Sequence, residues 1–458
     1  MKKLVSIFKN KEIMSRLIFT ILILLVFRIG AQVRVPGVEI PDQSRLNSYL
    51  NNNGALAIMN LLGGGTLQSF SIFALGVSPY ITSQIIVELL ASDVLPALAD
   101  LKRQGQYGRK KMNMATRYLT LLLGAVQAYG IIKTMEAQGK DVLVFNVGEV
   151  PWLTYLYVVI VLLAGCMVVI WLGDQITSKG IGNGISMIIF AGIVSSYPNQ
   201  IATAFSTWVS QGFMTGMPNE AITGIFKFLL YIFFDLLIIT FVTFVELSKR
   251  KIPVQNSGKS GGQTASMSRA SFLPIKINSA SVIPVIFASS LLAAPSVIAA
   301  FIDPNQADAR WLGIFSTSTM YQMGENFAMP WGLIIYLVLT IAFTFFYANL
   351  QINPAEMAEN FQKNGSYIPG VRPGIETERY VRKVLNRVTV LGALSLAIIA
   401  AIPPILSMTG VFGDQGQALS LGGTGLIIVV GVALELNNQI DGLLAGKSFD
   451  EVVASGGR

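Results

Sequence analysis

Gly54-Ala-Leu-Ala-Ile-Met-Asn-Leu-Leu-Gly-Gly-Gly65 is a short apolar stretch that ends in three glycines. A membrane-spanning helix needs about 20 mostly apolar residues, so this stretch is too short to cross a bilayer. Backbone that is not part of a spanning helix is tolerated at membrane depth only where protein buries it or where it lines a cavity. A long apolar segment follows directly. The sequence therefore predicts a membrane protein with a short segment folded into a cavity.

The rest of the chain is dominated by apolar segments of membrane-spanning length. Of its 458 residues, 52% are hydrophobic and 13% are charged, and the mean hydropathy of +0.59 excludes an ordinary soluble domain. We expect an all-α membrane protein with ten transmembrane helices. The expected spans are Leu17–Val35, Phe70–Ala91, Ala115–Ile132, Trp152–Leu172, Ile181–Ile201, Ile222–Val245, Ala280–Ile302, Trp331–Leu350, Val388–Met408 and Gly422–Leu444.

Positive charge is concentrated on one side of these spans. Most of the 33 Lys and Arg residues lie in the N-terminal segment, the 2–3, 6–7 and 8–9 loops, the 4–5 turn and the C-terminal tail. Cytoplasmic segments of membrane proteins are enriched in Lys and Arg, so we expect both termini in the cytoplasm. The basic N-terminal segment also resembles the start of a signal peptide, but no small-residue cleavage site follows it, and nine more spans do.

The residue types present exclude several kinds of chemistry. The chain has no His, which is the commonest general base and metal ligand, and its single Cys166 lies inside the fourth span and cannot form an intramolecular disulfide. We find no Walker A sequence and no GxGxxG motif in the sequence. We therefore expect no catalytic residues, no metal site and no cofactor, and an intramembrane enzyme is the least favoured class.

The ten spans divide into two groups of five, which we place in residues 1–205 and 206–458. Structural repeats with an odd number of spans must be inverted relative to each other, and inverted repeats enclose a site at their interface. Under that symmetry spans 2 and 7 are equivalent and should face each other. Both spans contain helix-disrupting residues. These are Gly76 and Pro79 in span 2 and Pro284 and Pro295 in span 7.

Five ionisable residues lie in or near the spans. Glu88, Glu435 and Asp441 fall near the predicted cytoplasmic ends, where the interface tolerates charge. Arg28 and Asp235 lie deeper. They either form a buried pair or face a polar cavity separately.

Short motifs occur in a characteristic order along nearly the whole chain. They are Val26-Phe-Arg-Ile-Gly30, Pro36-Gly-Val38, Ser71-Ile-Phe-Ala-Leu-Gly-Val-Ser-Pro-Tyr-Ile81, Gly180-Ile-Gly-Asn-Gly-Ile-Ser186, Val282-Ile-Pro-Val-Ile-Phe-Ala-Ser-Ser290, Ile352-Asn-Pro354, Tyr367-Ile-Pro-Gly-Val-Arg-Pro-Gly374 and Gly422-Gly-Thr424. In this order and spacing they resemble the SecY/Sec61-alpha family of protein translocase channels. The resemblance implies two inverted five-helix halves around an hourglass pore.

The resemblance also implies a ring of apolar side chains at the waist of the pore. Matched motif by motif, the ring would consist of Val77, Ile81, Ile185, Ile189, Ile286 and Ile428. Residues four apart share one face of a helix, so Val77 and Ile81 of span 2 lie on one face, and so do Ile185 and Ile189 of span 5. Without the resemblance, ordinary helix packing explains these residues equally well. A hydrophobic constriction resists wetting by water and ions.

The opening stretch corresponds to the plug of the family, at about residues 54–69. The plug would include Leu61 and Leu62, and its hinge would be Gly63, Gly64 and Gly65, since Gly tolerates unusual dihedral angles. The resemblance places a lateral gate between spans 2 and 7. Our candidates for facing gate positions are Thr82 and Ala294.

The resemblance implies a passive channel that translocates unfolded secretory polypeptides and releases membrane-protein helices into the bacterial cytoplasmic membrane. Implied partners are SecE-like and SecG-like small membrane subunits, the motor ATPase SecA, the ribosome and signal sequences. The docking surface would lie on the long loops at about residues 247–279 and 353–387. Its candidate residues are Arg372, Lys249, Arg250 and Lys251. The 6–7 loop departs from the family at 258–269, where a frequent basic pair is missing.

Two other interpretations remain open at this level. The basic loops are also explained by membrane topology together with contacts to anionic lipids. The alternative function is a secondary transporter of a small solute, which is another class with inverted repeats. A transporter should have a polar site at the membrane midplane, whereas this chain offers apolar residues there.

Overall fold

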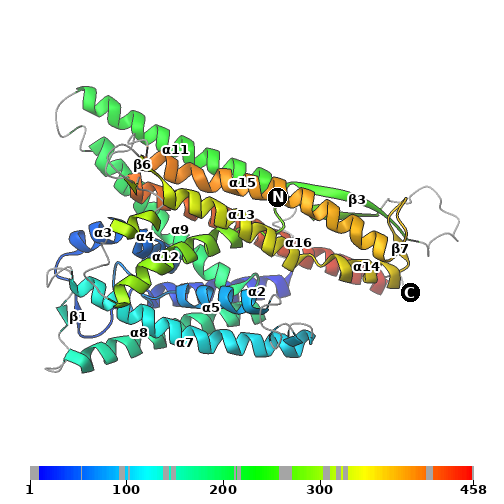
Figure 1. Ribbon diagram of the computed structural model, residues 1–458, viewed down its shortest axis with the longest axis horizontal. Helices are drawn as coiled ribbons and strands as arrows, with labels where there is room; N and C mark the ends of the chain where they lie inside the picture. The colour runs from blue at the N-terminus through cyan, green and yellow to red at the C-terminus, as the bar shows by residue number, and fades with distance from the viewer. Residues whose placement is uncertain are drawn as a thin grey trace.

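The computed structural model describes residues 10–52, 54–91, 98, 100–101, 104–137, 144–145, 151–210, 213, 218–256, 271–302, 310–315, 321–322, 328–408 and 416–455. Helices dominate these residues and run roughly parallel to one long axis (Figure 1). The ten that correspond to the predicted spans are α2 (Lys11–Gly30), α5 (Ser78–Leu89), α7 (Gly105–Ala137), α8 (Pro151–Lys179), α9 (Gly184–Phe205), α11 (Pro218–Leu247), α12 (Ile283–Ile302), α13 (Trp331–Gln351), α15 (Ile375–Met408) and α16 (Gly416–Ser455).

Eight of these helices, within the described part of the chain, are long and apolar enough to cross a membrane. Helix α5 has only 12 residues, and the fully described part of α12, Ile283–Pro295, is a shorter apolar helix. Several other helices are longer than predicted. For example, α7 starts ten residues before Ala115, because its first turns are polar and hydropathy does not detect them.

The second predicted span is only partly helical, which corrects its N-terminal boundary. Residues 64–77 form turns, and α5 begins at Ser78. Gly76 has a positive φ of 54°, and Pro79 occupies the first turn, where its missing N–H costs no helical hydrogen bond. These two residues therefore mark the start of the helix and do not kink it. The turns are satisfied by neighbouring backbone, since the Ile72 N–H donates to the Val33 carbonyl at 2.9 Å.

The opening stretch forms a separate ten-residue helix, α4 (Gly54–Gly63), preceded by α3 (Gln43–Asn52). The N–H of Gly65 donates to the Asn60 carbonyl at 2.8 Å, and the N–H of Gly64 to the Leu61 carbonyl at 3.0 Å. This is the Schellman ending, which needs a left-handed residue after the helix. Gly64 supplies it with φ of 73°. The prediction of a short helix that ends in glycines is confirmed, and the role of these glycines as a hinge stays a prediction.

We use the word half for each predicted group of five helices, which are α2, α5, α7, α8 and α9 before residue 206 and α11, α12, α13, α15 and α16 after it. Helices α7 and α8 form one outer layer and α11, α13 and α15 the opposite one, with α4, α9 and α12 between them (Figure 1). The halves meet where α9 packs on α16 and where α12 packs on α5 and α7. The predicted adjacency of spans 2 and 7 is therefore confirmed.

One end of the bundle carries a sheet that the all-α prediction did not include. Strands β3 (Lys249–Asn256), β4 (Ser271–Lys276) and β7 (Ser366–Tyr367) pair antiparallel in the order β4-β3-β7, close to helix α14 (Pro354–Lys363). We call this the sheet end; it lies at the right of Figure 1. Ile252 and Val254 point inward onto Val381 and Leu385 of α15. Alternate burial along β3 is what makes a strand the stable form here.

The remaining elements are short. They are β1 (Val38–Glu39) paired with β2 (Val144–Phe145), β5 (Tyr321–Gln322) paired with β6 (Ala328–Met329), η2 (Ser206–Ser210) and η4 (Arg310–Phe315).

Candidate functional site

An extended apolar cluster joins the two halves along their interface. It contains buried side chains from both halves together with the short helix α4. Five of the six predicted ring residues are buried in it, and the sixth is partly buried against it. The buried five are Val77, Ile81, Ile189, Ile286 and Ile428, with exposed fractions between 1% and 6%, and the sixth is Ile185. Positions from α5, α9, α12 and α16, far apart in sequence, are thus brought into one apolar environment.

Ile185 differs from the other five in what it contacts. A Cβ atom added at Gly173 of α8 would lie 2.7 Å from the Cδ1 atom of Ile185. The Ile185 side chain therefore packs into the space left by a glycine of its own half. Its assignment to the ring stays a prediction.

The C-terminal end of α4 lies in the same cluster. Leu61 and Leu62 are both buried in it. A Cβ atom added at Gly425 of α16 would lie 3.4 Å from a methyl group of Leu61 and 2.9 Å from Ile193. Helix α4 thus contacts helices of both halves, and its role as a plug stays a prediction.

The predicted hinge fits between two other glycines. A Cβ atom on Gly64 would lie 2.3 Å from the Cα atom of Gly192, and one on Gly76 would lie 2.9 Å from the Cα atom of Gly63. The backbone of the hinge therefore touches α9 on one side and the turn before α5 on the other. Gly65, the third predicted hinge residue, has φ of 83° but more open surroundings.

The two deep charges found in the sequence do not form a pair. Arg28 Nη1 donates a hydrogen bond of 2.9 Å to the carbonyl oxygen of Gly64. Asp235 on α11 accepts one of 2.7 Å from the hydroxyl of Tyr197 on α9. Each charge is satisfied separately, one at the hinge of α4 and the other between the two halves. No sequence pattern indicated these partners, because each lies more than 30 residues away in the chain.

The candidate gate residues lie on adjacent helices. Thr82 on α5 and Ala294 on α12 are both half-buried, and the Thr82 hydroxyl donates to the Ser78 carbonyl at 3.1 Å. Helices α5 and α12 contact each other. That Thr82 and Ala294 face each other stays a prediction.

The candidate docking residues lie on the sheet end. Lys249, Arg250 and Lys251 are exposed on β3, and the Lys251 ammonium lies 4.8 Å from the ring centroid of Phe272. Arg372 is exposed in the turn before α15, where its carbonyl accepts a 2.9 Å hydrogen bond from Thr377. Pairing of β3 with β7 joins the 6–7 and 8–9 loops into one surface. The 258–269 segment, where the basic pair is missing, lies outside the described residues.

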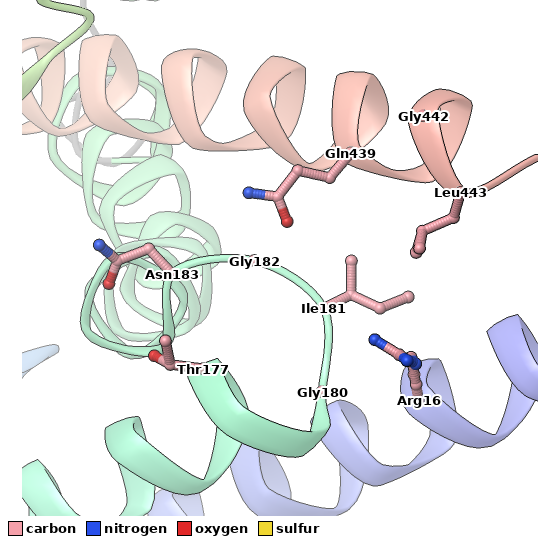
Figure 2. Close-up of a pocket in the computed structure, with 9 residues that line it drawn as sticks. All are labelled: Arg16, Thr177, Gly180, Ile181, Gly182, Asn183, Gln439, Gly442 and Leu443. Atoms are coloured by element: carbon pink, nitrogen blue, oxygen red, sulfur yellow. The ribbon is translucent and has the colours of Figure 1, made fainter. Parts of the chain in front are cut away.

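A cavity of about 530 Å³ opens between the two halves at the sheet-end termini of α2 and α9 (Figure 2). Arg16 reaches it from α2, Asn183 from the α8–α9 turn and Gln439 from α16. Asn183 also caps α9, since its side-chain oxygen accepts from the N–H of Ile185 at 3.1 Å. None of the nine residues that line the cavity belongs to the predicted ring. The sequence motif at 180–186 marked this turn but did not indicate its contact with α16.

Comparisons with known proteins agree with this architecture. A family model described as SecY matches residues 71–437. The chain is 42% identical to the protein translocase subunit SecY of Streptococcus sanguinis over 98% of both chains, and 40% identical to that of Lactococcus lactis over 98% of this chain and 97% of the relative. A solved structure described as a protein-conducting channel superposes with a TM-score of 0.63 at 18% identity, covering 94% of this chain and 92% of that one. Sec61 in a canine ribosome–channel complex superposes with a TM-score of 0.61 at 17% identity and the same coverage. The matched family model and these near-full-length relatives show that the chain belongs to the SecY family.

Proposed function

We propose that this chain is the passive channel subunit of a protein translocase, which conducts unfolded secretory polypeptides across the bacterial cytoplasmic membrane. The observation that carries the proposal is the apolar cluster at the interface of the halves, with α4 seated against the predicted ring. Family membership supports a translocation channel over the small-solute transporter that the sequence left open.

The chemistry of the cluster suits a channel for arbitrary polypeptides. Buried Val and Ile side chains make no hydrogen bonds to a passing chain, so no particular sequence is selected or held. A narrow apolar constriction also dewets, which opposes the leakage of ions. With α4 in place, Leu61 and Leu62 fill the space beside the ring. Packed apolar side chains thereby seal the resting channel.

Lateral release needs the two halves to separate where no covalent connection holds them. Helices α5 and α12 belong to different halves, are far apart in the chain and contact each other. If they part, an apolar signal sequence or membrane helix in the channel can move into lipid. The driving force is the transfer of apolar surface, about 25 cal/mol per Å². We assign the lateral gate to this contact, with Thr82 and Ala294 at its surface.

The sheet end supplies the surface for energy-providing partners. Its exposed Lys249, Arg250, Lys251 and Arg372 form a basic face suited to acidic partners such as ribosomal RNA, the motor SecA or anionic lipids. By the positive-inside rule this end is cytoplasmic, together with both termini. We expect SecE-like and SecG-like subunits to complete the complex. One structural neighbour was solved in a ribosome–channel complex, which supports the ribosome as a partner of the sheet end.

The test is in-vivo crosslinking of a stalled secretory chain to single cysteines placed at Ile81, Ile189, Ile286 and Ile428. The background is Cys166→Ala, which removes the one native thiol. Controls are cysteines at Leu22 and Leu229, which are 55% and 60% exposed on the outer surface. We expect crosslinks at all four ring positions and none at the controls. A stalled chain that is shown to engage the membrane yet crosslinks to no ring position would overturn the proposal.

A further inference from the structure

Glu88 and Tyr347 lie on opposite halves and are joined by a hydrogen bond. The Tyr347 hydroxyl on α13 donates a hydrogen bond to Oε2 of Glu88 on α5. The other carboxylate oxygen, Oε1, accepts a hydrogen bond of 2.9 Å from Nε2 of Gln84, one turn earlier on α5. The carboxylate thus has one partner in its own half and one across the interface.

Tyr347 is held in place by the aromatic side chains around it. Its ring centroid lies 4.9 Å from that of Phe287 on α12, in an edge-to-face arrangement, and 5.7 Å from that of Phe346. Phe287 also packs edge-to-face on Phe343 at 6.0 Å. The Tyr347 side chain is 6% exposed. Its hydroxyl therefore points at Glu88 without any need for the side chain to reorganise.

A second polar link joins the halves at a different edge. It is the 2.7 Å hydrogen bond from Tyr197 on α9 to Asp235 on α11. Helices α9 and α11 are consecutive in the chain, so that edge stays joined when the halves move. Helices α5 and α13 have no such connection. The edge they form can separate, and its separation breaks the bond between Glu88 and Tyr347.

We propose that the Glu88–Tyr347 hydrogen bond is a latch on the lateral gate, and that it sets how apolar a signal sequence must be to open the channel. The inference rests on the proposed function. The bond exists only while the halves are together, because Tyr347 moves with α12 and α13. After separation Glu88 keeps Gln84 and gains water, whereas the Tyr347 hydroxyl loses its charged acceptor.

A bond made only in the closed state favours that state over the open one. Hydrogen bonds to a charged group are about twice as strong as neutral ones. Loss of such a bond raises the ratio of open to closed channels by roughly ten- to hundredfold. A signal sequence overcomes this bias by burying apolar surface against the parted helices. Glu88 and Tyr347 are therefore specificity-determining residues that act on how apolar an accepted signal must be.

The experiment measures export of a reporter whose signal sequence is progressively shortened in its apolar core. The variants are Tyr347→Phe, which keeps the ring against Phe287, and Glu88→Ala. The matched control is Tyr155→Phe, since the Tyr155 hydroxyl bonds Glu136 at 2.5 Å but both residues lie in one half. We expect both latch variants to raise export of the weakest exportable signal about tenfold or more, and the control to leave it unchanged.

Two further variants show whether the residues act as a pair. The double variant Glu88→Ala with Tyr347→Phe should export the weak-signal reporter no better than either single variant, because the bond is broken only once. Glu88→Gln keeps an acceptor oxygen without the charge, so its effect should be intermediate. It also keeps the size of the side chain, which separates loss of the latch from loss of folding.

The outcomes separate the latch from the channel itself. Export of a reporter with a full-length apolar signal tests the proposed function. If the parent chain failed to export this reporter, both the channel assignment and the latch would be wrong. If the parent chain exports it but Tyr347→Phe leaves the threshold for weak signals unchanged, the latch is wrong and the channel stands. Additive effects of the two single variants, or an equal effect of Tyr155→Phe, would also overturn the latch.

Discussion

The guanidinium of Arg28, inside the first membrane helix, donates a hydrogen bond of 2.9 Å to the carbonyl oxygen of Gly64 in the hinge after α4. Gly64 has φ of 73°, and its backbone touches Gly192 of α9 so closely that neither residue has room for a side chain. A charged donor at membrane depth is costly unless it is satisfied. Here it is satisfied by the segment that we propose to be the plug.

Replacing Arg28 with Ala should loosen the plug. A hydrogen bond from a charged donor contributes about 1.5–3 kcal/mol, so the displaced state of α4 should become roughly ten- to hundredfold more populated. The measurement is the ion conductance of proteoliposomes that contain the channel without a substrate. Arg45→Ala is the control, because Arg45 pairs at 3.4 Å with Asp42 on an exposed face. An Arg28→Ala channel whose resting ion conductance equals that of the parent chain would contradict the anchoring role.

Gly192→Ala should displace the hinge from the other side. The new Cβ would lie 2.8 Å from the Cα atom of Gly64, and backbone cannot move aside as a flexible side chain can. Overpacking of this kind costs about 1–3 kcal/mol, all of it in the state with the plug seated. We expect higher conductance and faster crosslinking of translocating chains. Gly442→Ala, on α16 with nothing within 4 Å of the new atom, should behave as the parent chain does.

Ile286→Asn should weaken the seal at the predicted ring. Ile286 is 6% exposed inside the apolar cluster, and an amide there attracts water into the constriction. The expected result is a higher resting conductance together with export of reporters that carry defective signals. Ile286→Val, which keeps an apolar branched side chain, is the matched control. A mutant that stayed tight and selective would remove Ile286 from the ring.

Arg372→Ala should weaken binding of ribosomes several-fold and make the remaining binding less dependent on salt, because phosphate contacts release counterions. Cosedimentation of ribosomes with the solubilised protein at several salt concentrations measures both quantities. Lys363→Ala is the control, since Lys363 is also exposed near the sheet end but is already paired with Glu359 at 2.7 Å. An equal loss with both variants would indicate a general effect of positive charge and no docking role for Arg372.

Much of the fold could be read from the chain because the membrane imposes it locally. A hydrocarbon layer requires about 20 apolar residues per span, so hydropathy located the helices, and the asymmetry of Lys and Arg predicted their orientation. The short helix at 54–63 was also visible, because three glycines after an apolar stretch specify a helix end of left-handed geometry. The errors lie where polar residues extend a helix, as in α7, or where alternation makes a strand, as at Ile252 and Val254 of β3.

The sequence by itself determined the apolar spans, because span length depends on composition within one segment, and it predicted their orientation and candidate residues for a ring and a plug. Only the tertiary structure decided the partners. Arg28 forms a hydrogen bond with Gly64, and Asp235 forms one with Tyr197. Glu88 forms a hydrogen bond with Tyr347 across the interface, and Ile185 packs on Gly173. Such contacts join residues tens to hundreds of positions apart, and periodicity along a helix carries no information about which face of another helix it will meet.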